Sequence, residues 1–321
     1  MQILLCPFSF LLSFVLTPAV IGLAWRIGAV DVPLDGRRMH SQSIPRAGGL
    51  AIYTAFSLAC LAGGVYTHRL AVVLCGGGLM LLVGLADDIF TLSAAVKLFF
   101  QFAATLACVL AMGMKGILEI GAAVFWVMAL TNAHNFIDGL DGLFAGCAAI
   151  EGAALFLTLI LLGKGERSFP ALLLCSACLG FRRFNRYPAV IFAGDCGSAS
   201  VGFLLGLLSL PLFEGDVPSL SWLAPIFLFA YPLTDLFCAI FRRTARGKNP
   251  FAADRGHLHH WLYDAGLLQP QCVKVLLLIT FAFSAVGVVL CKATLTPFAA
   301  FAVAALAFLL MRIHRFVAEF H

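Results

Sequence analysis

Hydrophobic residues in this chain are gathered into long runs, and polar residues are confined to the short segments between them. The runs cover residues 3–25, 47–65, 70–86, 97–113, 117–133, 143–162, 169–181, 198–213, 220–240, 271–291 and 294–311. A helix of about 20 apolar residues crosses the hydrocarbon core of a bilayer. The pattern therefore predicts an all-α polytopic membrane protein with about eleven transmembrane helices. Ten is the alternative, because the fourth and fifth runs are short and close together.

The composition excludes other classes of protein. Only 12% of the 321 residues are charged and 62% are hydrophobic, whereas soluble proteins carry about 25% charged residues. The longest polar connection, residues 241–270, is too short for a soluble domain. Residues 1–321 are thus predicted to form a single transmembrane domain. The first run lacks a preceding basic segment and a cleavage site, so it is interpreted as a span rather than a removed signal peptide.

The eleven cysteines lie almost entirely inside apolar runs. Free cysteine behaves as a small hydrophobic residue in such places. We therefore predict neither structural disulfides nor zinc. The net charge of +5 indicates membrane topology rather than nucleic-acid binding, because basic residues set the orientation of membrane proteins.

The basic residues predict the orientation of the chain. An odd number of spans puts the termini on opposite faces. With the amino terminus outside, sixteen of the 21 Lys and Arg residues fall inside and five outside. The positive-inside rule then places the amino terminus in the periplasm and the carboxyl terminus in the cytoplasm. The same orientation gathers five polar segments on the cytoplasmic face: residues 31–49, 86–97, 132–142, 181–198 and 242–260.

Acidic residues follow several of the runs. Asp87 and Asp88 end the third run, where they suit cation binding, catalysis as a base, or simply a solvated helix end. Lys97 follows nine residues after Asp88 and could hold a phosphate or reach toward water. Asp195, between small residues, suits either a helix cap or a magnesium ligand.

The segment NAHNFIDGLDG is the densest in polar groups. Asp138 and Asp141 are three residues apart, and Asn135 precedes Asp138 by three, so a helical turn would put them on one face. Polar groups directly after an apolar span are costly without a partner, which favours a binding site. His134 by itself is more typical of local structure.

Histidines and arginines share the last cytoplasmic segment. His257, His259 and His260 lie near Arg242 and Arg243, without a thiolate or the H-E-x-x-H spacing typical of zinc. This composition favours binding of a diphosphate. The motifs together predict phosphoryl transfer at the membrane surface, in which carboxylates hold Mg²⁺ and basic groups neutralise the leaving group. A lipid and a nucleotide conjugate are the expected substrates.

Taken in order, these motifs resemble the polyprenyl-phosphate N-acetylhexosamine-1-phosphate transferases, glycosyltransferase family 4, from Asp31 to His260. The resemblance implies an enzyme dependent on Mg²⁺, with Mn²⁺ as the alternative. It would transfer the sugar 1-phosphate of a UDP-N-acetylhexosamine to undecaprenyl phosphate, releasing UMP. The reaction would occur at the cytoplasmic face of the bacterial inner membrane and initiate a lipid-linked glycan such as O-antigen. A homodimer is compatible with the resemblance.

The resemblance also implies roles for individual residues. Asp195 would bind the metal, and Asp87 and Asp88 would position or deprotonate the lipid phosphate. His257 and His259 would take part in catalysis. The expected substrate contacts are Lys97, Asn135, Asp138, Asp141, Asn185, Arg242, Arg243 and His260. The PRAGG and DRGHLHH motifs resemble the GlcNAc-1-phosphate and O-antigen branch.

Other functions explain less of the sequence. In the related muramoyl-pentapeptide branch three histidines are consecutive, whereas Leu258 interrupts them here. A proton-coupled transporter would not need five polar segments on one face. An intramembrane aspartyl protease could use Tyr231, Asp235 and Asp195, but it would leave the histidines unused. A CDP-alcohol phosphotransferase would need an Ala-Arg that is missing after the Asp-Gly.

Overall fold

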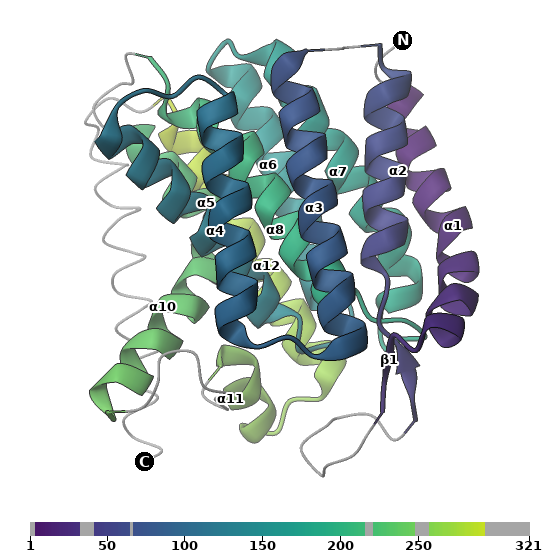
Figure 1. Cartoon of the computed structure of the whole chain (residues 1–321). Coiled ribbons are helices and arrows are strands. Elements are labelled where there is room, and N and C mark those ends of the chain that lie inside the picture. Colours follow the sequence, from purple (N-terminus) through teal and green to yellow (C-terminus); the bar gives the residue numbers. More distant parts are fainter. Residues whose placement is uncertain (1–3, 33–41, 65–66, 216–220, 248–256, 293–321) are drawn as a thin grey trace.

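The computed structural model describes residues 4–32, 42–64, 67–215, 221–247 and 257–292. Helices dominate these ranges (Figure 1): α1 (Leu5–Ile27), α2 (Gly49–Ala62), α3 (His68–Phe90), α4 (Ala94–Ala111), α5 (Ile117–Ile137), α6 (Leu143–Leu161), α7 (Gly165–Asn185), α8 (Gly194–Ser209), α9 (Ala224–Leu228), α10 (Ala230–Ala245), α11 (Leu258–Asp264) and α12 (Gln269–Leu290). Short 3₁₀ turns, η2 (Leu210–Phe213) and η3 (Ser221–Leu223), connect α8 to α9. One small hairpin was not expected, since β1 (Val30–Asp31) pairs antiparallel with β2 (Ile44–Pro45).

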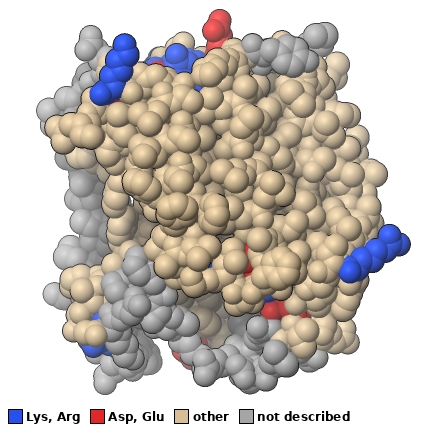
Figure 2. Space-filling model, viewed as in Figure 1, with Lys and Arg blue, Asp and Glu red and all other residues tan. Residues whose placement is uncertain are grey.

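The helices form a bundle, and from α1 to α8 consecutive members run in opposite directions. The ends of α3, α5 and α7 and the starts of α4, α6 and α8 therefore lie at the same end, together with the hairpin and α11 (Figure 1). On the face seen in Figure 2, a broad band without charged side chains separates charged residues near the two ends. This is the surface expected of a bundle that lies in a bilayer.

Seven helices of the described ranges are long and apolar enough to cross a membrane, counting α8 together with η2: α1, α3, α4, α5, α6, α8 and α12. The prediction of a mostly helical membrane protein is confirmed to that extent. Helix α2, with 14 residues, extends only about 21 Å at 1.5 Å per residue. The span count of eleven and the orientation of the termini stay predictions, and the run 294–311 lies outside the described residues.

The prediction of one continuous helix over residues 220–240 is wrong. The chain there forms η3, α9 and α10, with a break at Phe229. Pro232 has no N–H, and its ring would clash with the carbonyl of Leu228 in a continuous helix. The Leu228 carbonyl instead accepts a hydrogen bond from the hydroxyl of Ser284 on α12, at 2.8 Å. A neighbouring helix thus satisfies the carbonyl that the break releases.

Helix α8 is the centre of the bundle. All of its residues from Cys196 to Ser209 are buried. Glycines on three sides allow its close approach: a Cβ on Gly84 of α3 would lie 2.5 Å from the backbone of α8, and one on Gly49 of α2 would lie 2.3 Å from it. On the third side, a Cβ on Gly202 would lie 2.7 Å from the Leu130 carbonyl of α5. The position of α8 is therefore set by backbone contact.

We predict opposite effects for two glycine-to-alanine substitutions. Gly84→Ala should destabilise the protein by about 1–3 kcal/mol, because the added methyl group overpacks the contact between α3 and α8. Gly121→Ala should leave it unchanged or more stable, because nothing lies within 4 Å of its Cβ position and alanine favours helix. Thermal unfolding of the detergent-solubilised variants measures both. Equal midpoints for the two would contradict the packing argument.

Candidate active site

The carboxylate of Asp88, at the end of α3, faces the first turn of α8. Its Oδ1 accepts a hydrogen bond from the backbone N–H of Asp195, and its Oδ2 accepts one from the N–H of Cys196, each at 3.0 Å. The first N–H groups of a helix have no partner inside it. Asp88 therefore caps α8 from a different helix, and the helix dipole favours its negative charge. This contact fixes the position of the Asp195 side chain.

Arg46 supports the same junction from the segment before α2. Its guanidinium donates to the backbone carbonyl of Asp88 through Nη2 at 2.7 Å, and its Nε lies 3.7 Å from the Asp88 Oδ1. The carbonyl of Arg46 lies so close to Gly194 that a Cβ there would be 2.1 Å away. Gly194 also has a φ of 73°, a conformation that favours glycine. Glycine at position 194 thus has a steric reason.

Lys97 joins two carboxylates at the start of α4. Its Nζ donates to Oδ2 of Asp87 at 2.9 Å and to Oδ2 of Asp195 at 2.8 Å. The other oxygen of Asp87 accepts the backbone N–H of Leu92 at 2.6 Å. An ammonium group between two carboxylates offsets their mutual repulsion. The structure thus brings Asp195 together with Asp87 and Lys97, which the sequence places in a different polar segment.

Asp138 follows α5 and adds a further carboxyl group. Its burial and the negative charges of Asp195, Asp88 and Asp141 raise its pKa to about 8. At neutral pH this carboxyl group is therefore largely protonated in the absence of a bound cation. A raised pKa beside several acids is typical of a site where a positive ligand is to be bound.

Asn135 and Asp141 are held by neighbouring segments. The Oδ1 of Asn135 accepts the hydroxyl of Ser198 on α8 at 2.7 Å. The Oδ2 of Asp141 accepts the backbone N–H of Ala189, in the loop before α8, at 2.9 Å. The first hydrogen bond joins the end of α5 to α8. The second joins the loop between α5 and α6 to the loop that precedes α8.

Asn185, at the end of α7, joins the loop between α5 and α6 to the loop between α7 and α8. Its Oδ1 accepts the N–H of Gly142 at 3.1 Å, and its Nδ2 donates to the carbonyl of Ile191 at 3.0 Å. The side chain is buried. The geometry indicates a positioning role, while direct contact of Asn185 with substrate stays a prediction.

The histidines lie together at the start of α11. The rings of His257 and His259 are parallel, with centroids 5.6 Å apart, and the ring of His260 is 4.2 Å from that of His259. Burial and the neighbouring His260 lower the pKa of His259 to about 3. His259 is therefore a neutral hydrogen-bonding group at physiological pH rather than a cation.

These groups surround a polar cavity of about 810 Å³. The predicted site residues that line it are Asp88, Asn135, Asp138, Asp141, Asp195, His259 and His260. Asp87 and Lys97 do not line the cavity. Lys97 contacts Asp195, which does, and Asp87 contacts Lys97. The cavity lining does not include Asn185, Arg242, Arg243 or His257. Arg243 packs over the ring of Phe136, 5.2 Å from its centroid, so substrate contact by the two arginines stays a prediction.

The donor set of this cavity fits a magnesium ion. Asp195 and Asp138 supply carboxylate oxygens, and the high pKa of Asp138 indicates that negative charge there lacks compensation. Within the described ranges, no group of three or more His, Cys, Asp or Glu side chains is arranged as a metal cage. Magnesium typically binds one or two carboxylates and takes its other ligands from phosphates and water.

Comparison of the sequence with known proteins shows the family of this chain. The sequence profile of "Glycosyl transferase family 4" matches residues 70–213. The chain is 35% identical over 303 residues to a "Probable undecaprenyl-phosphate N-acetylglucosaminyl 1-phosphate transferase" of Bacillus subtilis (strain 168), covering 89% of this chain and 84% of that protein. The chain belongs to glycosyl transferase family 4.

Two further relatives in family 4 carry similar names. A decaprenyl-phosphate N-acetylglucosaminephosphotransferase of Mycolicibacterium smegmatis is 34% identical over 300 residues, covering 80% of this chain and 74% of its own. An undecaprenyl-phosphate alpha-N-acetylglucosaminyl 1-phosphate transferase of Escherichia coli K12 is 26% identical over 291 residues, covering 83% and 77%. The family resemblance of the motifs is thereby confirmed.

The family 4 site contains residues that the sequence argument did not assign. Arg46 lies in the PRAGG motif, two residues before Gly48, the N-cap of α2, and this position could have marked it. Asp235 is a carboxylate within a predicted span, which is itself a signal of function. Glu151 is fully buried in α6 and its Oε2 lies 2.7 Å from Nε2 of His134. This pair joins α5 to α6 outside the lining of the polar cavity.

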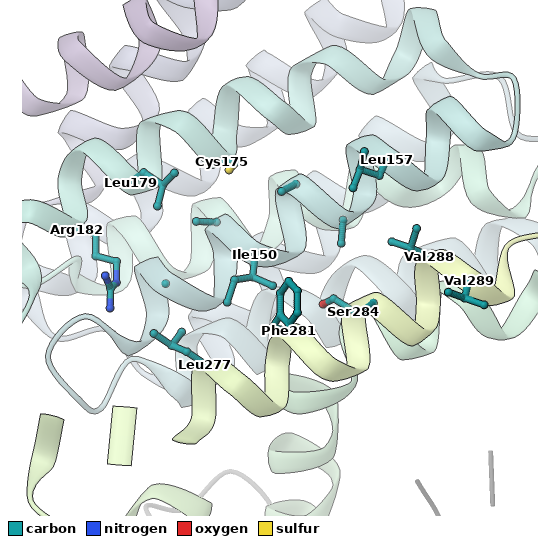
Figure 3. Close-up of a pocket in the computed structure, with 15 residues that line it drawn as sticks. Ile150, Leu157, Cys175, Leu179, Arg182, Leu277, Phe281, Ser284, Val288 and Val289 are labelled. Atoms are coloured by element: carbon teal, nitrogen blue, oxygen red, sulfur yellow. The ribbon is translucent and has the colours of Figure 1, made fainter. Parts of the chain in front are cut away.

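A second hollow in the surface has a different character. It is a groove of about 610 Å³ between α6, α7 and α12, lined almost entirely by apolar side chains such as Ile150, Leu157 and Phe281 (Figure 3). Arg182 is the one charged residue among the described residues that line it, and Figure 3 shows it at one end of the groove. Without convergent polar groups, this groove does not suit phosphoryl transfer, whereas the polar cavity does.

We predict that two isosteric substitutions at this site differ in their effect on stability, because Asp88 holds the start of α8 in place and the Asp195 side chain does not. Asp88→Asn should lower stability by about 1–3 kcal/mol, because its amide group cannot accept both α8 N–H groups and leaves one of them buried without a partner. Asp195→Asn should leave stability nearly unchanged, since the described contacts of the Asp195 carboxylate are to Lys97 rather than to backbone. Thermal unfolding in detergent distinguishes them. Equal loss in both variants would overturn the capping role.

Proposed function

We propose that the protein transfers GlcNAc 1-phosphate from UDP-GlcNAc to undecaprenyl phosphate and releases UMP. The names of its relatives support the lipid and the sugar. The observation that carries the proposal is the cluster of Asp87, Lys97 and Asp195 at the edge of a polar cavity, at one end of an apolar bundle. A lipid phosphate at the membrane surface and a nucleotide from the cytoplasm can meet there.

Asp195 is proposed to hold Mg²⁺, with Asp138 as the second carboxylate of the cavity. When bound, the ion would neutralise charge on the diphosphate of the donor. Lys97 lies 2.9 Å from Asp87 and 2.8 Å from Asp195, so it keeps both carboxylates in place and can contact a phosphate oxygen. Asp88 is engaged with two backbone N–H groups. Asp87 is engaged with Lys97 and with the N–H of Leu92, so contact of either carboxylate with the lipid phosphate stays a prediction.

The histidine segment is proposed to bind the leaving UMP. His259 and His260 line the cavity, and neutral His259 can donate a hydrogen bond to the nucleotide or accept one from it. We further propose that the reaction takes place on the cytoplasmic side of the bacterial inner membrane. It would start a lipid-linked envelope glycan such as O-antigen.

The nucleotide product tests the proposed function. The lipid phosphate would attack the sugar-linked phosphorus of the donor, so UMP must be the product, whereas cleavage of the sugar–oxygen bond would give UDP. One phosphoanhydride replaces another, so added UMP should reverse the reaction. Purified protein with undecaprenyl phosphate, UDP-GlcNAc and Mg²⁺ should form UMP, and Asp195→Asn should be slower by orders of magnitude. Asp264→Asn, an exposed change on α11, serves as the matched control. UDP as the product, or full activity of Asp195→Asn, would contradict the proposal.

The pKa of Asp138 predicts how metal binding depends on pH. A group with a raised pKa keeps its proton below about pH 8, and a cation must displace that proton. Affinity for Mg²⁺ should therefore rise with pH, by up to about tenfold per unit below pH 8, and level off above it. Calorimetric titration with Mg²⁺ at several pH values measures this. Asp138→Asn should reduce the slope, because it removes one titrating carboxyl group, and a slope unchanged in that variant would contradict the assignment.

A further inference from the structure

One carboxylate outside the polar cavity holds the histidine segment. Asp235 lies on α10 and is 5% exposed. Its Oδ2 is 2.7 Å from Nδ1 of His257, and its Oδ1 accepts the backbone N–H of Leu258 at 3.0 Å. Leu258 is the first residue of α11. A single side chain of α10 thus fixes both a histidine ring and the start of the helix that carries His259 and His260.

The two contacts define the state of the His257 ring. An ionised carboxylate only accepts hydrogen bonds, so Nδ1 of His257 must carry a proton and donate it. The Nε2 edge then points away from α10. The ring is also confined by Phe136, which meets it edge-on at 5.6 Å between centroids, and by the parallel ring of His259. Both the orientation and the protonated nitrogen of His257 are therefore determined.

The position of α11 matters for the cavity wall. The ring of His259 packs on Gly139 so closely that a Cβ there would lie 3.0 Å from Nε2 of His259. Gly139 belongs to the loop that carries Asp138 and Asp141. A shift of α11 would therefore open or close the gap between the histidines and the acidic loop. Asp235 holds the start of α11 from the buried first half of α10.

We propose that Asp235 is a positioning residue of the reaction, which acts through His257 to set the place of His259 and His260 at the cavity. This inference rests on the proposed function for its kinetic test. It differs from simple packing, because it requires the effect of Asp235 to pass through one partner, His257. It also requires a proton on Nδ1 of that partner.

A double-mutant cycle tests the first requirement. Asp235→Asn can still accept the Leu258 N–H but cannot accept the Nδ1–H, so the His257 ring should exchange its protonated nitrogen. We expect kcat to fall by about 10- to 100-fold, as for other outer partners of functional histidines, with little change in KM for UDP-GlcNAc. In a His257→Ala background the same substitution should cause no further loss. Additive losses in the double variant would overturn the proposal.

The matched control is Asp264→Asn, the same isosteric change at an exposed position of α11. It should leave both kcat and thermal stability at the wild-type values. Asp235→Glu should recover part of the activity that Asp235→Asn loses, because it restores the carboxylate. If Asp235→Glu is no more active than Asp235→Asn, the site requires the shape of the aspartate side chain rather than its charge. That result would count against the proposal.

A measurement on the wild-type protein tests the second requirement without any reaction. Nitrogen-15 NMR of imidazole-labelled protein, with the His257 signal identified by its loss in His257→Ala, reports which ring nitrogen carries a proton. A proton on Nδ1 is expected, and an unprotonated Nδ1 would overturn the inference even if Asp235→Asn does not fold. If the wild-type protein does not form UMP from UDP-GlcNAc while Nδ1 is protonated, the proposed function fails and the contact with Asp235 stands.

Discussion

The active site depends on one capping contact, the carboxylate of Asp88 on the first N–H groups of α8. Helix α8 is buried along almost its whole length, so its amino terminus is the one part of it that meets the polar end of the bundle. Those N–H groups need acceptors. The two carboxylate oxygens of Asp88 accept the N–H groups of Asp195 and Cys196, each at 3.0 Å. The result is that Asp195, one residue into the helix, stands within reach of Lys97 and Asp87. The contact of Asp195 with Lys97 follows from this placement.

Packing and chemistry at this junction impose the same constraint. Gly84 and Gly49 let α3 and α2 touch the backbone of α8, and Gly194 lets the turn pass the carbonyl of Arg46. A side chain at any of these positions would separate the elements that carry the carboxylates. The cluster therefore requires small residues as strictly as it requires acidic ones. Its rigidity also suits electrostatic catalysis, in which charged groups must be in place before the reaction begins.

A second polar unit, the histidine segment, is built on the other side of the cavity and is attached differently. It belongs to a short helix, α11, which is fixed to α10 by Asp235 and meets the acidic loop through His259 and Gly139. The break between α9 and α10 at Phe229 allows α10 its own direction, and Ser284 satisfies the carbonyl that the break exposes. The site thus combines an acidic half held against the backbone of α8 with a histidine half held by a few side-chain contacts.

The sequence alone determined the helical membrane architecture, the gathering of polar motifs at one end and most of the acidic residues of the cavity. It could do so because apolar run length and the residues at run ends reflect the bilayer directly. Only the tertiary structure decided that Asp88 caps a helix and that Asn185 joins two loops by hydrogen bonds. It also decided that a break before Pro232 divides residues 220–240, and that Asp235 holds His257. These features join residues far apart in the chain, such as Asp88 and Cys196. Their hydrogen bonds depend on how the helices pack, which run length and local spacing do not encode.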